Sequence, residues 1–242
     1  MRTAILILLF SKIASAASTG SLLGISLVDT KAGASLGVPM QITILMTLLA
    51  LLPAAIMSVT PFLRISIVLH FLRQALGTQT IPSNQVLVGL SLFLTMIVVG
   101  PLFSQIHANA WVPMENGTLT QEQAIEAAGK PLKVFLAKYA REKDIKLFLE
   151  ISHAPAPRKP DDLDLKVLIP AYIISELKTG FQIGAVLYLP FLVIDIVVAS
   201  VTLSIGMVQL PPVMLSAPFK ILLFVLVDGW NLLIGSLIKS FY

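Results

Sequence analysis

Four long apolar stretches constrain this chain more than any other feature of its sequence. The first is a run of 21 residues without a charge, from Met40 to Thr60. At about 1.5 Å per residue, a helix of that length matches the apolar thickness of a bilayer. The other three stretches are almost as free of charge: Gln85–Phe103, Gln182–Met207 and Val213–Ile238. Each stretch therefore predicts a helix that lies in a membrane assembly.

Composition supports this interpretation and excludes several classes of function. The 242 residues are 56% hydrophobic and 12% charged, with a mean hydropathy of +0.89, which is too apolar for a soluble domain. The net charge of +4 is modest and no basic block is interleaved with aromatics, so no nucleic acid partner is expected. Cysteine is absent and the three histidines are scattered, so neither a metal site nor a cofactor is expected. The apolar segments hold no nucleophile with a base and no paired carboxylates, and we expect no enzyme.

The first residues have the pattern of a secretory signal. Arg2 precedes a short apolar core, Ala4–Phe10, and small residues follow at Ala14–Ala16. The pattern predicts a signal peptide over residues 1–16, cleaved between Ala16 and Ala17. A retained anchor is the alternative, but seven apolar residues fall far short of the ~20 that span a bilayer. Residues 17–39, which are rich in Gly and Ser, are expected to form a periplasmic lead-in.

Residues 40–103 are predicted to form a first hydrophobic helical hairpin. Its two apolar stretches are joined by Pro61–Asn84, which contains Arg64 and Arg73 and no acidic residue. The preference of basic residues for the cytoplasmic side places this connection there.

Residues 104–181 form the polar part of the chain and are predicted to be a small periplasmic helical domain. Ten basic and ten acidic residues balance there, as suits the outer side, where no positive excess is needed. Thr120 and Gln123 have the spacing of a capping box, and Pro131 is expected to start a further helix. A helical apolar stripe follows: Leu132, Phe135, Leu136 and Tyr139.

Residues 182–242 are predicted to form a second hydrophobic hairpin, turning at Val208–Pro212. Its charges up to Ile238 are Asp195, Lys220 and Asp228. In straight helices folded about Gln209, Asp195 and Lys220 lie roughly 21 and 17 Å from the tip. The similar depths predict a salt bridge, within one chain or between subunits. Asp228 lies deeper, at roughly 29 Å, and its neighbour Trp230 favours a headgroup position.

Two interpretations of the Asp195–Lys220 pair remain open. Intramembrane carboxylates often line proton or ion paths, so one alternative function is a secondary transporter or proton channel that uses Asp195. Buried pairs also fix the geometry of assemblies without titrating. We favour this second interpretation, because each charge has an opposite partner.

Three stretches of the chain resemble the FliP family, the membrane component of the export gate in flagellar type III secretion. They read PAYIISELKTGFQIG over Pro170–Gly184, PFLVIDIVVASVTLSIGM over Pro190–Met207 and PFKILLFVLVDGW over Pro218–Trp230. The resemblance covers nearly all of the mature chain and is specific in all three.

The resemblance implies an all-α integral membrane protein of two long kinked helical hairpins and a small extracytoplasmic domain. It implies that five copies assemble with the FliQ and FliR proteins into a ring or cone, beside other export-apparatus membrane proteins and membrane lipid. Unfolded flagellar proteins would pass through this gated conduit at the basal body, in the bacterial inner membrane. Burial against neighbouring subunits would explain the intramembrane prolines and charges.

The resemblance also implies a pore seal. Members of the family carry three methionines after the glycine, thought to form a gasket around the pore. The matching positions here are Met207, Val208 and Gln209. The gasket role is therefore carried over to Met207, whose flexible thioether side chain suits an irregular closure, and the seal here is expected to be looser or more polar.

Overall fold

The computed structural model describes residues 38–78, 80–153, 162–207 and 211–242. Within these ranges the chain is helical and contains no strand, which confirms the all-α fold. The predicted signal peptide, its cleavage site at Ala16 and Ala17, and most of the lead-in lie outside the described residues. The helices are α2 (Val38–Ser58), α3 (Phe62–Ala75), α4 (Asn84–Ile106), the π-helical η2 (His107–Trp111), α5 (Val112–Glu115), α6 (Gln121–Tyr139), α7 (Glu142–Ser152), α8 (Leu165–Ser204), α9 (Pro212–Leu226) and α10 (Gly229–Lys239).

The chain divides into two units, of which the first ends at Ala50 and the second runs from Leu51 to Tyr242. The described part of the first unit is the beginning of α2. Its threonine side chains are satisfied within the helix, because Thr43 and Thr47 each donate to a carbonyl one turn back, at 2.8 Å. The core and the ion pairs all belong to the second unit.

Three described helical segments are long and apolar enough to cross a membrane. They are Pro39–Ser58, Asn84–Glu115 and Leu165–Ser204. A fourth span is possible if α9 and α10 are taken together, although they are bent by 68°. The first three apolar stretches of the sequence therefore form helices with the length and composition of membrane spans, as predicted.

The bend between α9 and α10 differs from the single apolar arm expected over Val213–Ile238. Asp228 adopts a left-handed conformation with φ of 52°, which ends α9. A Cβ atom on Gly229 would lie 2.3 Å from the ring of Phe224, so only glycine lets the chain turn back so closely over that ring.

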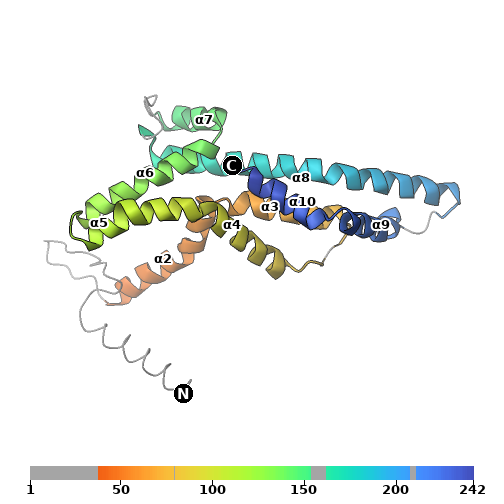
Figure 1. The fold of residues 1–242 in the computed structure, drawn as a ribbon, viewed down its shortest axis with the longest axis horizontal. Coiled ribbons are helices and arrows are strands. Elements are labelled where there is room, and N and C mark those ends of the chain that lie inside the picture. Colours follow the sequence, from red (N-terminus) through yellow and green to blue (C-terminus); the bar gives the residue numbers. More distant parts are fainter. Residues whose placement is uncertain (1–37, 79, 154–161, 208–210) are drawn as a thin grey trace, which may run out of the picture. The chain divides into compact units, whose positions relative to one another are not determined.

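Helix α8 joins the polar block to the last apolar segments without a break. It runs for 40 residues, and Figure 1 shows α6 and α7 near its first half and α9 near its second half. The expected boundary at 181/182 falls inside α8, and the boundary at 103/104 falls inside α4. Polarity of sequence changes at these points while the backbone continues as helix.

Helices α3 and α8 approach each other through two glycines one turn apart. A Cβ atom on Gly180 would lie 3.3 Å from the side chain of Ile67, and one on Gly184 would lie 2.5 Å from the ring of Phe71. The contacts advance along both helices in the same direction, so α3 and α8 run parallel. Small residues at this spacing let apolar helices pack at short range.

Two clusters of buried side chains hold the second unit together. The larger one centres on α3, with Val68, Leu69 and Leu72 fully buried, and includes side chains of α4, α8, α9 and α10. The smaller one packs α6 and the first turns of α8 around Leu136 and Tyr172. Helix α3, expected as part of a basic connection, is thus at the centre of the core.

Helix α6 begins as predicted and continues where a break was expected. The side-chain hydroxyl of Thr120 accepts a hydrogen bond from the backbone N–H of Gln123, and the side-chain oxygen of Gln123 accepts one from the backbone N–H of Thr120. These two hydrogen bonds confirm the capping box. The apolar stripe is confirmed as well, since Leu136 is buried in the smaller cluster. Pro131 does not start a helix but lies inside α6. A proline removes one hydrogen bond of the helix, but α6 continues past Pro131, with Ala124 buried before it and Leu136 buried after it.

We expect Gly184→Ala to lower the stability of the chain, because its new methyl group would overlap the ring of Phe71. Overpacking of this kind costs about 1–3 kcal/mol. Thermal unfolding of the purified protein in detergent measures the effect as a lower melting temperature.

Gly235→Ala is the matched control, because a Cβ atom there meets nothing within 4 Å. Alanine is better than glycine inside a helix by about 1 kcal/mol, so this variant should melt at the same or a higher temperature. Equal melting temperatures for the two variants would contradict the close approach of α3 and α8.

Candidate functional site

Helix α8 contributes one member to each of three ion pairs among the described residues. Glu176 pairs with Arg64, Lys178 with Asp144, and Asp195 with Lys220. Each pair ties α8 to a different helix: α3, α7 and α9. We describe the three pairs together as the α8 ion pairs.

The Arg64–Glu176 pair is the most deeply buried of the three. The guanidinium of Arg64 binds both carboxylate oxygens of Glu176, with its Nε at 2.9 Å from Oε2 and its second nitrogen on Oε1. Arg64 is 4% exposed and Glu176 is 0% exposed. Two parallel hydrogen bonds fix the relative position of α3 and α8 as well as neutralising the charges.

The last residues of α10 and beyond enclose this pair. The remaining nitrogen of Arg64 donates to the carbonyl and the hydroxyl of Ser240, at 3.3 and 3.2 Å. The ring of Phe241 stacks 4.1 Å from the guanidinium carbon, and the Tyr139 hydroxyl donates to the Phe241 carbonyl at 2.6 Å. Arg64 therefore joins α3, α8, α6 and the C-terminal segment at one point.

The Asp144 carboxylate fastens α7 to α8. It accepts a hydrogen bond from the Ser175 hydroxyl at 2.8 Å and another from Lys178. Burial raises the pKa of Asp144, but these hydrogen bonds and the charges of Lys178 and Arg141 lower it by more, so the pKa lies below its ordinary value. Arg141 adds hydrogen bonds to Thr179 and Gln182, at 2.9 and 2.6 Å.

The Asp195–Lys220 pair lies within one chain, between α8 and α9. Its nitrogen and carboxylate oxygen are 2.6 Å apart, and the Lys220 side chain is 1% exposed. The Ser216 hydroxyl donates to the other carboxylate oxygen, so both oxygens of Asp195 have partners. Such a complete set of partners holds a carboxylate in place.

The remaining predicted site residues lie apart from these pairs. Asp228 sits at the bend between α9 and α10, where the Asn231 side-chain amide donates to it at 3.1 Å. Met207 follows the last turn of α8 and is 40% exposed. The Met207 N–H donates to the Thr202 carbonyl, and the N–H of Gly206, which has a φ of +79°, donates to the Leu203 carbonyl. These two hydrogen bonds form a Schellman motif. Val208 and Gln209 lie outside the described residues.

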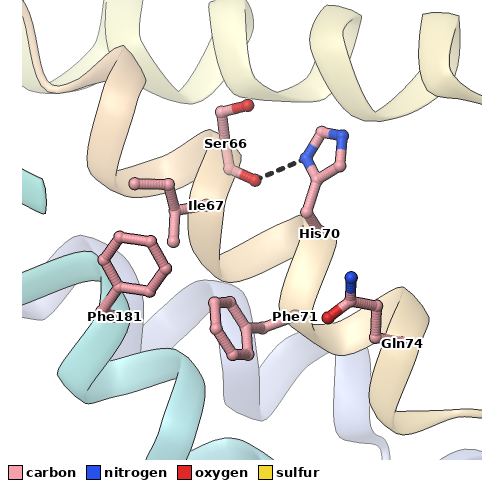
Figure 2. A pocket seen from close by; sticks show the side chains of 6 residues that line it. All are labelled: Ser66, Ile67, His70, Phe71, Gln74 and Phe181. Carbon is pink, nitrogen blue, oxygen red and sulfur yellow. Dashed lines mark hydrogen bonds between the residues drawn. The ribbon is translucent and has the colours of Figure 1, made fainter.

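A shallow pocket marks the crossing of α3 and α8 on their exposed side. Figure 2 shows its apolar wall of Ile67, Phe71 and Phe181, with the rings of Phe71 and Phe181 edge to face at 5.7 Å. The opposite wall carries His70, whose Nδ1 donates to the Ser66 carbonyl at 2.7 Å. No group of His, Cys, Asp and Glu among the described residues could hold a metal ion.

Sequence reasoning missed two of the three α8 ion pairs. It took Arg64 as a marker of the cytoplasmic side and counted Glu176, Asp144 and Lys178 among the balanced charges of the polar part of the chain. The usable signal was the rule that a charge among apolar residues seeks an opposite partner. Applied to Arg64, that rule asks for an acid, but the sequence alone does not select Glu176, 112 positions away.

Replacing Glu176 with alanine should destabilise the fold strongly, because it leaves the buried guanidinium of Arg64 without a counter-charge. Breaking one partner of a buried pair costs about 3–5 kcal/mol, which chemical unfolding in detergent measures. Glu126→Ala, at an exposed position of α6, is the control and should be nearly neutral.

The double variant Arg64→Met with Glu176→Leu tests the cause. Apolar pairs of similar volume often replace a buried ion pair without loss, so most of the stability should return. A double variant as unstable as Glu176→Ala would show that shape, not charge, decides.

Docking of α7 on α8 should weaken in acid. Because the pKa of Asp144 in the folded chain lies below its ordinary value of 3.8, the Asp144 carboxylate stabilises the docking of α7 fully above pH 3.8. This stabilisation is lost as the pH falls through the lower pKa of the folded chain. Hydrogen exchange of α7, corrected for the intrinsic rate at each pH, should therefore accelerate below pH 3.8. Asp144→Asn should exchange faster already at neutral pH and lose this dependence. Glu150→Gln, at an exposed position of the same helix, should keep it.

Comparison with known proteins identifies the family. The family model described as "FliP family" matches residues 45–237. The "Flagellar biosynthetic protein FliP" of Pectobacterium carotovorum is 47% identical over 87% of this chain and 81% of its own. That of Bacillus subtilis is 47% identical over 83% of this chain and 91% of its own. The relative in Caulobacter vibrioides is 42% identical over the whole of this chain and 92% of its own.

The matched range includes all three α8 ion pairs. It excludes the predicted signal peptide and the last five residues, of which Ser240 and Phe241 contact Arg64. On the extent and identity of these matches, the chain belongs to the FliP family.

Proposed function

We propose that this chain is a subunit of the flagellar type III export gate and forms, with its partners, a gated conduit for unfolded flagellar proteins. The observation that carries the proposal is the family match over residues 45–237. The proposed partners are further copies of the chain, five as in the family, with FliQ, FliR and other export-apparatus membrane proteins. The proposed location is the bacterial inner membrane at the flagellar basal body.

The exposed apolar surface of the single chain supports an assembly. None of the apolar window in Pro39–Ser58 is buried, and only 11% of that in Leu165–Ser204 is buried. Surfaces of this kind are covered by lipid or by neighbouring subunits. We assign the chain a structural and not an enzymatic role, because the relatives are named as flagellar biosynthetic proteins.

The Asp195–Lys220 pair fits a structural role in this conduit. Both carboxylate oxygens are occupied, by Ser216 and Lys220, so Asp195 helps to hold α9 against α8. The relatives compared above are all named as flagellar biosynthetic proteins, which lends no support to the alternative of a secondary transporter or proton channel.

The proposed arrangement has a cleaved signal over 1–16, a lead-in over 17–39, hydrophobic hairpins over 40–103 and 182–242, and a periplasmic helical domain over 104–181. Continuous helix at 181/182 gives this arrangement a mechanical consequence. A displacement of the periplasmic domain is transmitted along α8 directly to Met207, which the Schellman motif holds at its end.

Closure of the conduit is assigned to Met207, Val208 and Gln209. Met207 fits this role because its side chain is flexible, partly exposed and placed at the end of a 40-residue helix. Gly206 sets the direction in which the chain leaves α8.

Native mass spectrometry of the chain expressed with FliQ and FliR tests the proposal. We expect a complex with several copies of the chain, each beginning at Ala17. The same chain should restore protein export and motility to a strain that lacks its own FliP protein. A monomer that binds neither partner, or a folded chain that restores no export, would refute the proposal.

A further inference from the structure

Two buried hydroxyl groups near the Arg64–Glu176 pair make no hydrogen bond with any residue that the structure describes. One is the hydroxyl of Tyr172, in α8, and the other is the hydroxyl of Thr60, in the connection between α2 and α3. Tyr172 as a whole is 1% exposed. Buried polar groups of folded proteins nearly always have a partner, so each exception calls for an explanation.

The two hydroxyls lie on the same side of the ion pair. Thr60 precedes Arg64 by four residues. Tyr172 precedes Glu176 by the same number of residues, which is about one turn of α8. Helices α3 and α8 run parallel, and the two hydrogen bonds of the ion pair fix their register. Val59, the neighbour of Thr60, packs against the smaller cluster, to which Tyr172 belongs. The two side chains therefore meet at one level of the fold.

The carboxylate of Glu176 can accept further hydrogen bonds beside these hydroxyls. A carboxylate offers about four lone-pair sites, and Arg64 donates to one site on each of the two oxygens. Glu176 is 0% exposed, so bulk water does not reach the remaining sites. The charges of Glu176 and Arg64 both act on the Tyr172 hydroxyl, which places this hydroxyl close to the pair.

A single water molecule matches this set of groups. Buried water makes about three hydrogen bonds, to polar groups that otherwise lack partners. At this site it accepts from the Tyr172 hydroxyl, donates to the Glu176 carboxylate and bonds the Thr60 hydroxyl. An apolar ligand leaves both hydroxyls unpaired, and an ion adds a charge where the pair is already balanced. Water is therefore the ligand that the chemistry of the site selects.

We propose that a buried water molecule binds beside the Arg64–Glu176 pair, where it bridges the hydroxyls of Thr60 and Tyr172 and donates to the Glu176 carboxylate. The water joins the residues before α3 to α8 and completes the polar network around the ion pair. A fully satisfied network of this kind stabilises one arrangement of the helices. The inference concerns the folded chain itself and does not depend on the proposed assembly.

The variant Tyr172→Phe tests the site through the sign of its effect on stability. Removing a buried hydroxyl without a partner stabilises a protein, whereas removing one that binds the water destabilises it. We expect Tyr172→Phe to raise the equilibrium constant of unfolding in detergent about fivefold. The matched control is Tyr139→Phe, which loses the hydrogen bond to the Phe241 carbonyl and should show a rise of similar size. An unchanged or more stable Tyr172→Phe would overturn the proposal.

A double-mutant cycle tests whether both hydroxyls bind the same water. The effect of Thr60→Val on the unfolding constant should change about threefold or more when Tyr172 is already Phe, because the shared water is then weakened. The control cycle combines Tyr172→Phe with Thr95→Val, whose hydroxyl is satisfied by the Ser91 carbonyl at 2.7 Å. The two effects in the control should be independent. Independent effects of Thr60→Val and Tyr172→Phe would contradict a shared ligand.

A density map of the purified chain with FliQ and FliR, at a resolution that shows ordered water, gives the direct readout. We expect a peak between the two side chains, about 2.5–3.0 Å from the hydroxyl oxygens of Thr60 and Tyr172. The peak should disappear in the double variant Thr60→Val with Tyr172→Phe. A direct hydrogen bond between the two hydroxyls, or a map without the peak, would refute the water site.

Discussion

The bidentate pair between Arg64 and Glu176 is the constraint on which the second unit depends. Both ions are removed from water, which is tolerable only while each keeps its partner. The pair fixes α3 against α8 and offers its open side to Ser240 and Phe241. Three segments far apart in the sequence therefore meet at one charge. The parallel packing of α3 on α8, through Gly180 and Gly184, continues from this point along both helices.

Helix α8 connects the Arg64–Glu176 pair to the other ion pairs of the second unit. Its first half holds α3 and α7 through Glu176 and Lys178, and its second half holds α9 through Asp195. Because α8 is continuous, a helix and not a linker joins the polar block to the last apolar segments. Met207, the proposed closing residue, lies just beyond the end of this 40-residue helix.

Patterns confined to neighbouring residues were predictable from the sequence. The capping box at Thr120, the apolar stripe through Leu136 and the membrane helices depend on spacings of a few residues, which the sequence displays. The pairing of Asp195 with Lys220 was predictable as well, because their helices follow one another in the sequence and the depths of the two residues could be compared. The bend at Asp228 was not predictable in this way, since it depends on the ring of Phe224 lying beside Gly229. Pro131 was misjudged because packing outweighed the local preference of proline to end a helix.

The sequence by itself determined that the chain belongs in a membrane and which family it belongs to. Apolar length fixes a membrane assembly, and the three motifs fix membership in the FliP family, because both are properties of consecutive residues. Only the tertiary structure decided which charges neutralise one another. Arg64 pairs with Glu176, which lies 112 positions away in the sequence, and Asp144 pairs with Lys178. Both pairs depend on the packing of helices, which no local sequence pattern encodes.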